Sequence, residues 1–325
     1  MRINQRSFVW IILTLCVLAV PVAVLTQNTP AKDTSGKESG GLMNRFKDHI
    51  QVIRLTGMIM DKADSGLFSS QTGSATTCIK DLRKALKNKK VKAVLLRINS
   101  PGGTVPTSQE VYEAVLDLKE AGKPVVVSMG DMAASGGYYV ACAADKIVAN
   151  PGTMTGSIGV IMNLMCYKGL ADKLGVEPET IKSGLFKDIA SPSHKMTKEE
   201  KDILQTLVID CYDQFTQVVA KGRNLPIEEV KRLADGRIYT GRQAQQNKLV
   251  DEIGTYTDAM ALLQKICKEK YKLTEDLQVD EDKSDGFLAS LLESTSLASP
   301  QASLENFVPT ELSPNLTKQP LWLYR

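Results

Sequence analysis

The stretch from Val94 to Met162 constrains the fold of this chain more than any other part of its sequence. Two nearly continuous apolar runs, 91–98 and 124–129, are each followed by a turn that contains consecutive glycines. Apolar runs of this length that lack polar alternation are typical of strands buried on both faces of a parallel sheet. The residues between the two runs have helical periodicity, so the stretch predicts consecutive strand–helix–strand units.

Further elements extend this pattern along the chain. The sequence predicts strands over 51–58, 91–98, 124–129, 146–149 and 157–162, and helices over 76–89, 107–121, 136–144, 197–222, 226–234 and 257–270. Thr107 with Glu110 and Thr197 with Glu200 have the spacing of capping boxes, which mark helix starts. Strands that alternate with helices predict an α/β domain with a mainly parallel sheet.

The first 26 residues predict a membrane anchor. Arg2 and Arg6 precede an apolar run from Phe8 to Leu25, which as a helix spans roughly 27 Å, enough to cross a bilayer core. Basic residues before the run predict a cytoplasmic N-terminus and an exported remainder. A cleaved signal peptide is the alternative, although its apolar region is normally shorter and ends at an A-x-A-like site. Residues 27–41 are polar and rich in glycine, serine and threonine, which predicts a flexible tether over 27–45.

Charge and cysteine content exclude several classes of protein. The net charge is +3, with 40 basic and 37 acidic residues, which argues against a nucleic-acid partner. The cysteines are widely spaced and none forms a C-x-x-C pair, so we expect buried small hydrophobes rather than a disulfide framework or a metal site. One disulfide stays open as an alternative in an oxidising compartment. The six are Cys16, Cys78, Cys142, Cys166, Cys211 and Cys267.

The first glycine turn is Asn99-Ser100-Pro101-Gly102-Gly103. Consecutive glycines at a strand end tolerate unusual backbone angles and leave N–H groups uncovered, as an oxyanion hole requires. A simple tight turn explains the same pentapeptide equally well. A phosphate-binding loop fits less well, because the segment has no Lys-Ser/Thr pair and no complete G-x-G-x-x-G.

Ser135 stands at the second glycine turn, with only alanine and glycine on either side. A serine between a strand and a helix N-terminus is suited to nucleophilic attack. The position is equally typical of a helix N-cap, and the local sequence alone favours that interpretation. The segment is also not a G-x-S-x-G elbow, because Ala133 replaces the first glycine.

A serine nucleophile needs a base, and the two histidines are poor candidates. His49 lies near the tether and His194 in a polar loop, where we expect surface residues. A lysine can serve only if burial lowers its pKa, which is ordinarily about 10.4. Lys187 has apolar neighbours along the chain, and a surface lysine paired with Asp188 is the alternative.

Four segments between Val52 and Gly254 resemble a known family. They read INSPGG, MAASGGYYVACAADKIVANPGTMTGSIGVI, IKSGLFKDIASPSHKMTKEE and ADGRIYTGRQAQQNKLVD. Together they resemble the signal peptide peptidase A family in its short bacterial form. The resemblance implies a Clp-protease/crotonase-like fold of repeated ββα units and a membrane-anchored serine endopeptidase. Its substrates would be cleaved signal peptides and other unfolded apolar peptides.

The resemblance also implies a role for particular residues. Ser135 would be the nucleophile and Lys187 the base of a Ser–Lys dyad, with Ser157 orienting the lysine amine. The backbone N–H groups of Gly103 and Gly136 would form the oxyanion hole. This chemistry implies no cofactor and no metal.

The same resemblance implies partners and a location. The chain would form a homo-oligomeric ring of about eight subunits, in which neighbouring subunits complete the active sites. It would lie in the bacterial cytoplasmic membrane as a single-pass protein, in contact with the lipid bilayer. Its N-terminus would be cytoplasmic and its peptidase domain extracytoplasmic.

These expectations divide the chain into four parts: the anchor over 1–26, the tether over 27–45, a peptidase domain over 46–275 and a poorly ordered tail over 276–325. The tail ends in the apolar segment 321–324, which resembles a tethered substrate. It could add as a strand to a peptide groove, or instead pack on the domain surface. A crotonase-like acyl-CoA enzyme and a catalytically silent membrane scaffold are the alternative functions.

Overall fold

The structure, a computed structural model, describes residues 47–61 and 73–281 and the backbone of residues 321–323. Its strands are β1 (His49–Thr56), β2 (Val91–Ser100), β3 (Gly102–Thr104), β4 (Val125–Ala134), β5 (Lys146–Ala149), β6 (Met154–Gly156), β7 (Ile238–Thr240), β8 (Glu252–Ile253), β9 (Gln278–Glu281) and β10 (Leu321–Leu323). Its helices are α2 (Ala75–Lys87), α3 (Val105–Glu120), α4 (Gly136–Ala141), α5 (Lys168–Lys173), α6 (Lys198–Arg223), α7 (Ile227–Leu233), α8 (Gly241–Gln246) and α9 (Tyr256–Tyr271).

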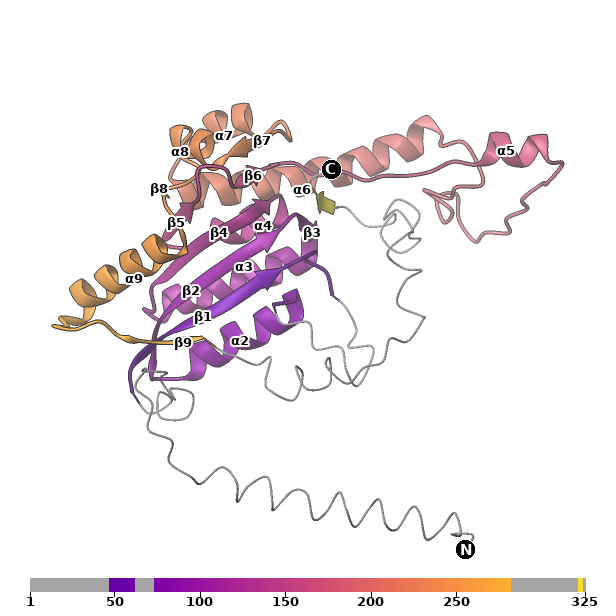
Figure 1. Ribbon diagram of the computed structural model, residues 1–325. Helices are drawn as coiled ribbons and strands as arrows, with labels where there is room; N and C mark the ends of the chain where they lie inside the picture. The colour runs from indigo at the N-terminus through magenta and orange to yellow at the C-terminus, as the bar shows by residue number, and fades with distance from the viewer. Residues whose placement is uncertain (1–46, 62–72, 282–320, 324–325) are drawn as a thin grey trace, which may run out of the picture. The chain divides into compact units, whose positions relative to one another are not determined.

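The main sheet has the strand order β7-β6-β4-β2-β1-β9, and β5 pairs with both β4 and β8 (Figure 1). Neighbouring strands in this sheet are parallel, except that β6 and β7 are antiparallel. The prediction of an α/β domain with a mainly parallel sheet is therefore confirmed. β9 belongs to the segment 276–325, which the sequence assigns to the tail, and it pairs with β1 at the edge of the sheet.

Two apolar layers cover the faces of the sheet, which explains the continuous apolar runs. In β2, Val94, Leu96 and Ile98 pack with buried side chains of α2 and α3. The alternate residues Ala93 and Leu95 pack with buried side chains of α9 on the other face. Successive side chains of a strand point to opposite faces, so both sets must be apolar for the strand to be buried.

The strand predicted over 157–162 is wrong. The strand at this place is β6, Met154–Gly156, which pairs with β4 and ends immediately before Ser157. Gly156 has φ 79° and Ser157 has φ 50°, values in the left-handed region, so the extended chain cannot continue through them. The start of α3 also differs, because the helix begins at Val105, before the expected capping box, with Pro106 in its first turn.

The long helix α6 confirms the second capping box. Thr197 Oγ1 accepts from the N–H of Glu200 at 3.2 Å, and the Glu200 carboxylate accepts from the N–H of Thr197 at 2.8 Å. Residues 161–197, which we call the arm, connect β6 to α6 and include α5. Figure 1 shows the arm beyond the N-terminal end of α6, away from strands β1, β2 and β4.

The predicted anchor and tether lie outside the described residues. Within the part of the chain that is described, no helix is long and apolar enough to cross a membrane. The cysteines of this part are free thiols, and Cys78, Cys142 and Cys267 are buried, as expected of small hydrophobes. Burial raises the pKa of Cys142 to about 12 and that of Cys267 to about 11, so both are protonated near neutral pH.

Candidate active site

Ser135 lies on a strained turn between β4 and α4. Its backbone angles are φ 53° and ψ −120°, which a non-glycine residue adopts only where the surrounding structure holds it. Ser135 occupies the N-cap position of α4, but its side chain makes no capping hydrogen bond, so capping does not explain the serine hydroxyl. Ser135 Oγ is fully buried, and it has no hydrogen-bond partner among the described residues. A buried hydroxyl without a partner destabilises the fold, which indicates a functional role.

Glycines let the two turns approach each other. A Cβ atom on Gly136 would lie 2.4 Å from Ser108 Oγ and 3.2 Å from the backbone N of Gly103. A Cβ atom on Gly103 would lie 1.8 Å from the carbonyl oxygen of Ile59. A side chain at Gly103 would displace the backbone at Ile59, and one at Gly136 would displace the Ser108 hydroxyl and crowd the backbone of Gly103.

This close approach brings two candidate oxyanion donors together. Gly136 is the first residue of α4, where the helix leaves N–H groups without intrahelical acceptors. The backbone N of Gly103 lies beside it, as the contact of the built Cβ shows. The first glycine turn is thus more than a simple tight turn, because its strand β3 packs against the residue that follows Ser135.

Ser157 lies close to the nucleophile in the sheet. The N–H of Ser135 donates to the carbonyl oxygen of Gly156 at 2.8 Å, and Ser157 follows directly. Ser157 is 5% exposed, and its own N–H donates to the carbonyl oxygen of Arg237 at 2.8 Å. The turn after β6 therefore places a second serine beside the turn after β4.

Lys187 is not next to Ser135 in this chain. It lies in a turn of the arm and is exposed, whereas Ser135 Oγ has no hydrogen-bond partner within the described segments. Its neighbours Leu185 and Phe186 are 72% and 40% exposed, so a single chain does not supply the apolar environment that a neutral lysine needs. Among the described residues Asp188 pairs with Lys182 and His194, and no ion pair joins it to Lys187.

The arm exposes many apolar side chains. Those more than half exposed include Met165, Leu170, Leu174, Val176, Ile181 and Leu185, and Ile181 is 97% exposed. A concentration of exposed apolar residues on one projecting segment is typical of a protein–protein interface.

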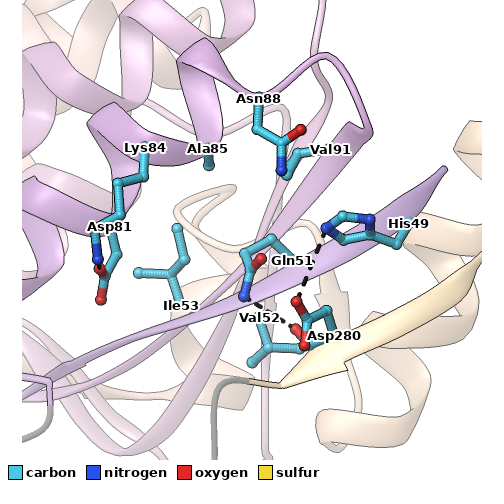
Figure 2. Close-up of a pocket in the computed structure, with 10 residues that line it drawn as sticks. All are labelled: His49, Gln51, Val52, Ile53, Asp81, Lys84, Ala85, Asn88, Val91 and Asp280. Carbon is cyan, nitrogen blue, oxygen red and sulfur yellow. Dashed lines mark hydrogen bonds and ion pairs between the residues drawn. The ribbon is translucent and has the colours of Figure 1, made fainter. Parts of the chain in front are cut away.

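The two histidines lie away from Ser135. His49 is 1% exposed, contrary to the expected surface position, and its Nδ1 donates to the carbonyl oxygen of Lys47 at 2.8 Å. Figure 2 shows it beside Asp280 in a polar pocket of about 400 Å³. His49 begins β1, whereas Ser135 follows the end of β4, and β1, β2 and β4 are parallel. The pocket therefore lies at the opposite end of the sheet from Ser135.

His194 belongs to a charged cluster on the arm that the sequence did not reveal. Its Nε2 lies 3.1 Å from Glu200 Oε1, and its Nδ1 lies 3.9 Å from Asp188 Oδ2. The pKa of Asp188 is lowered chiefly by the hydrogen bond from Lys182, and that of Glu200 chiefly by the backbone hydrogen bond from Thr197. The capping-box spacing signalled Glu200, but nothing in the sequence connected it to His194.

Residues Leu321–Leu323, near the end of the tail, form strand β10, which pairs with β3 of the first glycine turn. β10 pairs antiparallel with β3, so that Leu321 lies opposite Thr104 and Leu323 opposite Gly102. β3 therefore offers its edge to an added strand beside Ser135, as β-addition requires.

Comparison with known proteins supports a peptidase. Residues 117–270 match peptidase family S49, and residues 66–155 match Clp protease. A candidate signal peptide peptidase SppA of Enterococcus faecium is 46% identical over 242 residues, covering 74% of this chain and 69% of that protein. A candidate protease of Synechocystis is 41% identical over 265 residues, covering 78% and 92%. Protease 4 of Haemophilus influenzae is 37% identical over 221 residues, covering 68% and 35%.

Proposed function

Because this chain belongs to peptidase family S49 and is a serine protease, we propose that Ser135 and Lys187 form its catalytic dyad. We propose further that it is a membrane-anchored endopeptidase that degrades cleaved signal peptides and other unfolded apolar peptides. The similarity to SppA of Enterococcus faecium supports this substrate class. A Ser–Lys dyad needs no cofactor, since backbone donors and an amine supply the chemistry.

The environment of Ser135 Oγ carries this proposal. The hydroxyl is buried on a strained turn, lacks a hydrogen-bond partner among the described residues, and adjoins two glycine backbones at a helix N-terminus. Strain and an unmet hydrogen bond each cost stability, and they are retained where the mechanism needs them. A crotonase-like acyl-CoA enzyme uses no serine nucleophile, so it would not account for the buried hydroxyl of Ser135. A catalytically silent scaffold would not account for the strained backbone at this residue.

The reaction is acyl transfer in two steps. Ser135 Oγ attacks the scissile carbonyl carbon while its proton passes to the neutral amine of Lys187. The N–H groups of Gly103 and Gly136 stabilise the oxyanion, and the leaving amine takes the proton back from Lys187. Lys187 then deprotonates a water molecule, whose oxygen attacks the acyl carbon. As the ester bond breaks, the protonated Lys187 gives its proton to Ser135 Oγ. Ser157 orients the lysine amine by a hydrogen bond.

A second subunit supplies Lys187 in this proposal. Ser135 Oγ lacks a partner within the described residues, and Lys187 lies on an arm rich in exposed apolar side chains. Docking of that arm on a neighbour would bury the apolar residues and desolvate the lysine at the same time. A closed ring of about eight subunits repeats this head-to-tail contact without leaving a free end.

The N-terminal segment gives the proposed location. Its basic residues and apolar run support a single-pass anchor in the bacterial cytoplasmic membrane, with the peptidase domain extracytoplasmic. A short tether would keep the active site near the bilayer, where cleaved signal peptides are released.

Dependence on pH tests the identity of the base. Only a neutral amine accepts a proton, so we expect kcat/KM on an apolar fluorogenic peptide to rise continuously from about pH 6 to about pH 9. A histidine base would instead give a plateau above about pH 7. A plateau of that kind that persists in Lys187→Ala would refute Lys187 as the base and show that Ser135 has another proton acceptor.

The pairing of β10 with β3 supports β-addition as the mode of substrate binding. A tethered strand competes with free peptide at a high effective concentration. We therefore expect deletion of residues 316–325 to lower the KM for an apolar peptide at least about threefold, with kcat unchanged. Deletion of residues 306–315 is the matched control, because it shortens the tail equally and keeps its apolar end. An unchanged KM, with no trimming of the wild-type C-terminus, would refute occupation of the groove by the tail.

A further inference from the structure

Within the described part of the chain, the backbone hydrogen bonds made inside the turn that bears Lys187 are local. The N–H of Lys187 donates to the carbonyl oxygen of Gly184 at 3.2 Å, and the N–H of Ser191 donates to that of Asp188 at 2.9 Å. Both bonds lie inside the turn, so they fix its shape but not its position. Its position depends on contacts outside the turn. The carbonyl oxygen of Pro192 accepts from the N–H of Tyr167, at the start of α5, at 2.9 Å, and side chains connect the turn to α6.

Asp188, the residue after Lys187, makes that connection. Its Oδ1 accepts from Lys182 Nζ at 2.6 Å, and its Oδ2 lies 3.9 Å from His194 Nδ1. The Asp188 side chain is 15% exposed, although most residues of the turn are open to solvent. The carboxylate therefore lies between two side chains that flank the lysine in the sequence, those of Lys182 and His194.

His194 continues the connection to α6. Its Nε2 lies 3.1 Å and 3.2 Å from the two carboxylate oxygens of Glu200, whose side chain is 5% exposed. Hydrogen bonds lower the pKa of Glu200, so its carboxylate is ionised near neutral pH and can only accept. Nε2 must therefore carry a proton and donate, and the ion pair of Nδ1 with Asp188 forms when His194 is protonated on both ring nitrogens.

Glu200 is fixed by the N-terminal cap of α6, at the junction with the arm. Its carboxylate accepts from the N–H of Thr197 at 2.8 Å and closes the capping box at the start of the 26-residue helix α6. The N-terminus of a helix favours a negative charge there. A continuous set of contacts thus leads from a rigid helix end through Glu200 and His194 to Asp188, one residue from Lys187.

We propose that Asp188 is a positioning residue for Lys187, and that His194 and Glu200 hold Asp188 against α6. The inference rests on the proposed role of Lys187 as the base. The groups that face Asp188 in the described structure are Lys182, His194 and Glu200. Asp188 does not touch the reacting atoms in this proposal. It fixes the place from which Lys187 reaches the Ser135 hydroxyl of a neighbouring subunit.

The test uses the purified full-length protein in detergent, assayed with an apolar fluorogenic peptide across pH. We expect Asp188→Ala to lower kcat about 10- to 100-fold, with KM changed less than about twofold, because misplacement of a catalytic group affects the chemical step. Asp188→Asn keeps the oxygen that accepts from Lys182, so we expect it to recover most of the lost kcat.

The same two variants separate positioning from general stabilisation of the arm. Asp188→Asn removes a negative charge beside Lys187, and a negative charge favours the protonated amine. We therefore expect its kcat/KM profile to shift toward lower pH by a few tenths of a unit. A purely structural role would lower the unfolding temperature and would not move the profile. Asp172→Asn is the matched control, because it breaks the ion pair with Lys168 on the same arm, and we expect wild-type kinetics from it.

Two further variants, Lys187→Ala and Ser135→Ala, distinguish the possible failures. If Lys187→Ala is inactive but Asp188→Ala keeps wild-type kcat, the positioning role is refuted and the dyad stands. If Lys187→Ala is itself active, the dyad is refuted, whatever Asp188 does. If Asp188→Asn recovers no activity and shows no pH shift although its unfolding temperature is normal, the positioning role is also refuted.

Discussion

Replacement of Ser135 with alanine is expected to lower kcat at least about 10³-fold while the protein stays folded. The nucleophile is lost, and only substrate binding and the oxyanion donors remain to promote hydrolysis by water. Because Ser135 Oγ is buried without a partner among the described residues, its removal breaks no hydrogen bond there. We therefore expect the unfolding temperature to be unchanged or raised, since burial of an unpaired hydroxyl is unfavourable.

Ser128 provides a matched control on β4, the strand that leads to Ser135. It is 1% exposed, and its Oγ accepts from Arg97 Nη1 at 2.8 Å. Ser128→Ala should lower stability by about 1–3 kcal/mol, because it removes one of the two acceptors of Arg97 Nη1, the other being the carbonyl oxygen of Met129, and should leave kcat near wild type. Peptide hydrolysis and thermal unfolding of both variants would check the pair of predictions. Wild-type activity in Ser135→Ala would refute the assigned nucleophile.

Replacement of Lys187 with alanine is expected to have a comparably large effect. Without the amine, the Ser135 hydroxyl has no acceptor for its proton, and the leaving amine has no donor. The double variant should be no less active than either single variant, because residues that act as one unit are not additive. The unfolding temperature of the subunit should not change, since Lys187 is exposed on the arm. Measurement of kcat for the three variants checks this, and strictly additive losses would contradict a shared step.

The parallel sheet could be predicted because its strands are buried on both faces. Continuous apolar runs in 91–98 and 124–129 correspond to β2 and β4, whose side chains alternate between two apolar layers. The capping box at Thr197 gave the start of α6 for a similarly local reason. The antiparallel strand β7, by contrast, has a side-chain pattern too short to recognise, and its pairing with β6 depends on residues far away in sequence.

The wrong strand boundary at 157–162 has a cause that lies outside the local sequence. Residues 157–162 have the apolar character of a strand, yet the left-handed backbone at Ser157 ends β6 before them. The tertiary structure imposes that backbone angle, because the N–H of Ser157 bonds to the carbonyl oxygen of Arg237. No local sequence pattern predicts a contact between residues so distant along the chain.

The site was only partly predictable for a related reason. Glycine content marked the two turns, but the sequence could not show that Gly136 lies against Gly103 or that Ser135 makes no capping bond. The resemblance to a family, rather than local chemistry, selected Lys187. Its apolar setting is absent from the single chain, because the residues around it are exposed.

Subunit complementation tests the central claim most directly. Ser135→Ala and Lys187→Ala chains are each expected to be inactive alone, but equal amounts co-expressed in one membrane can form mixed assemblies. If each site joins Ser135 of one chain to Lys187 of a neighbour, about one site in four holds both residues, and about a quarter of wild-type activity should return. No recovery in assemblies shown to contain both chains would contradict an active site completed between subunits.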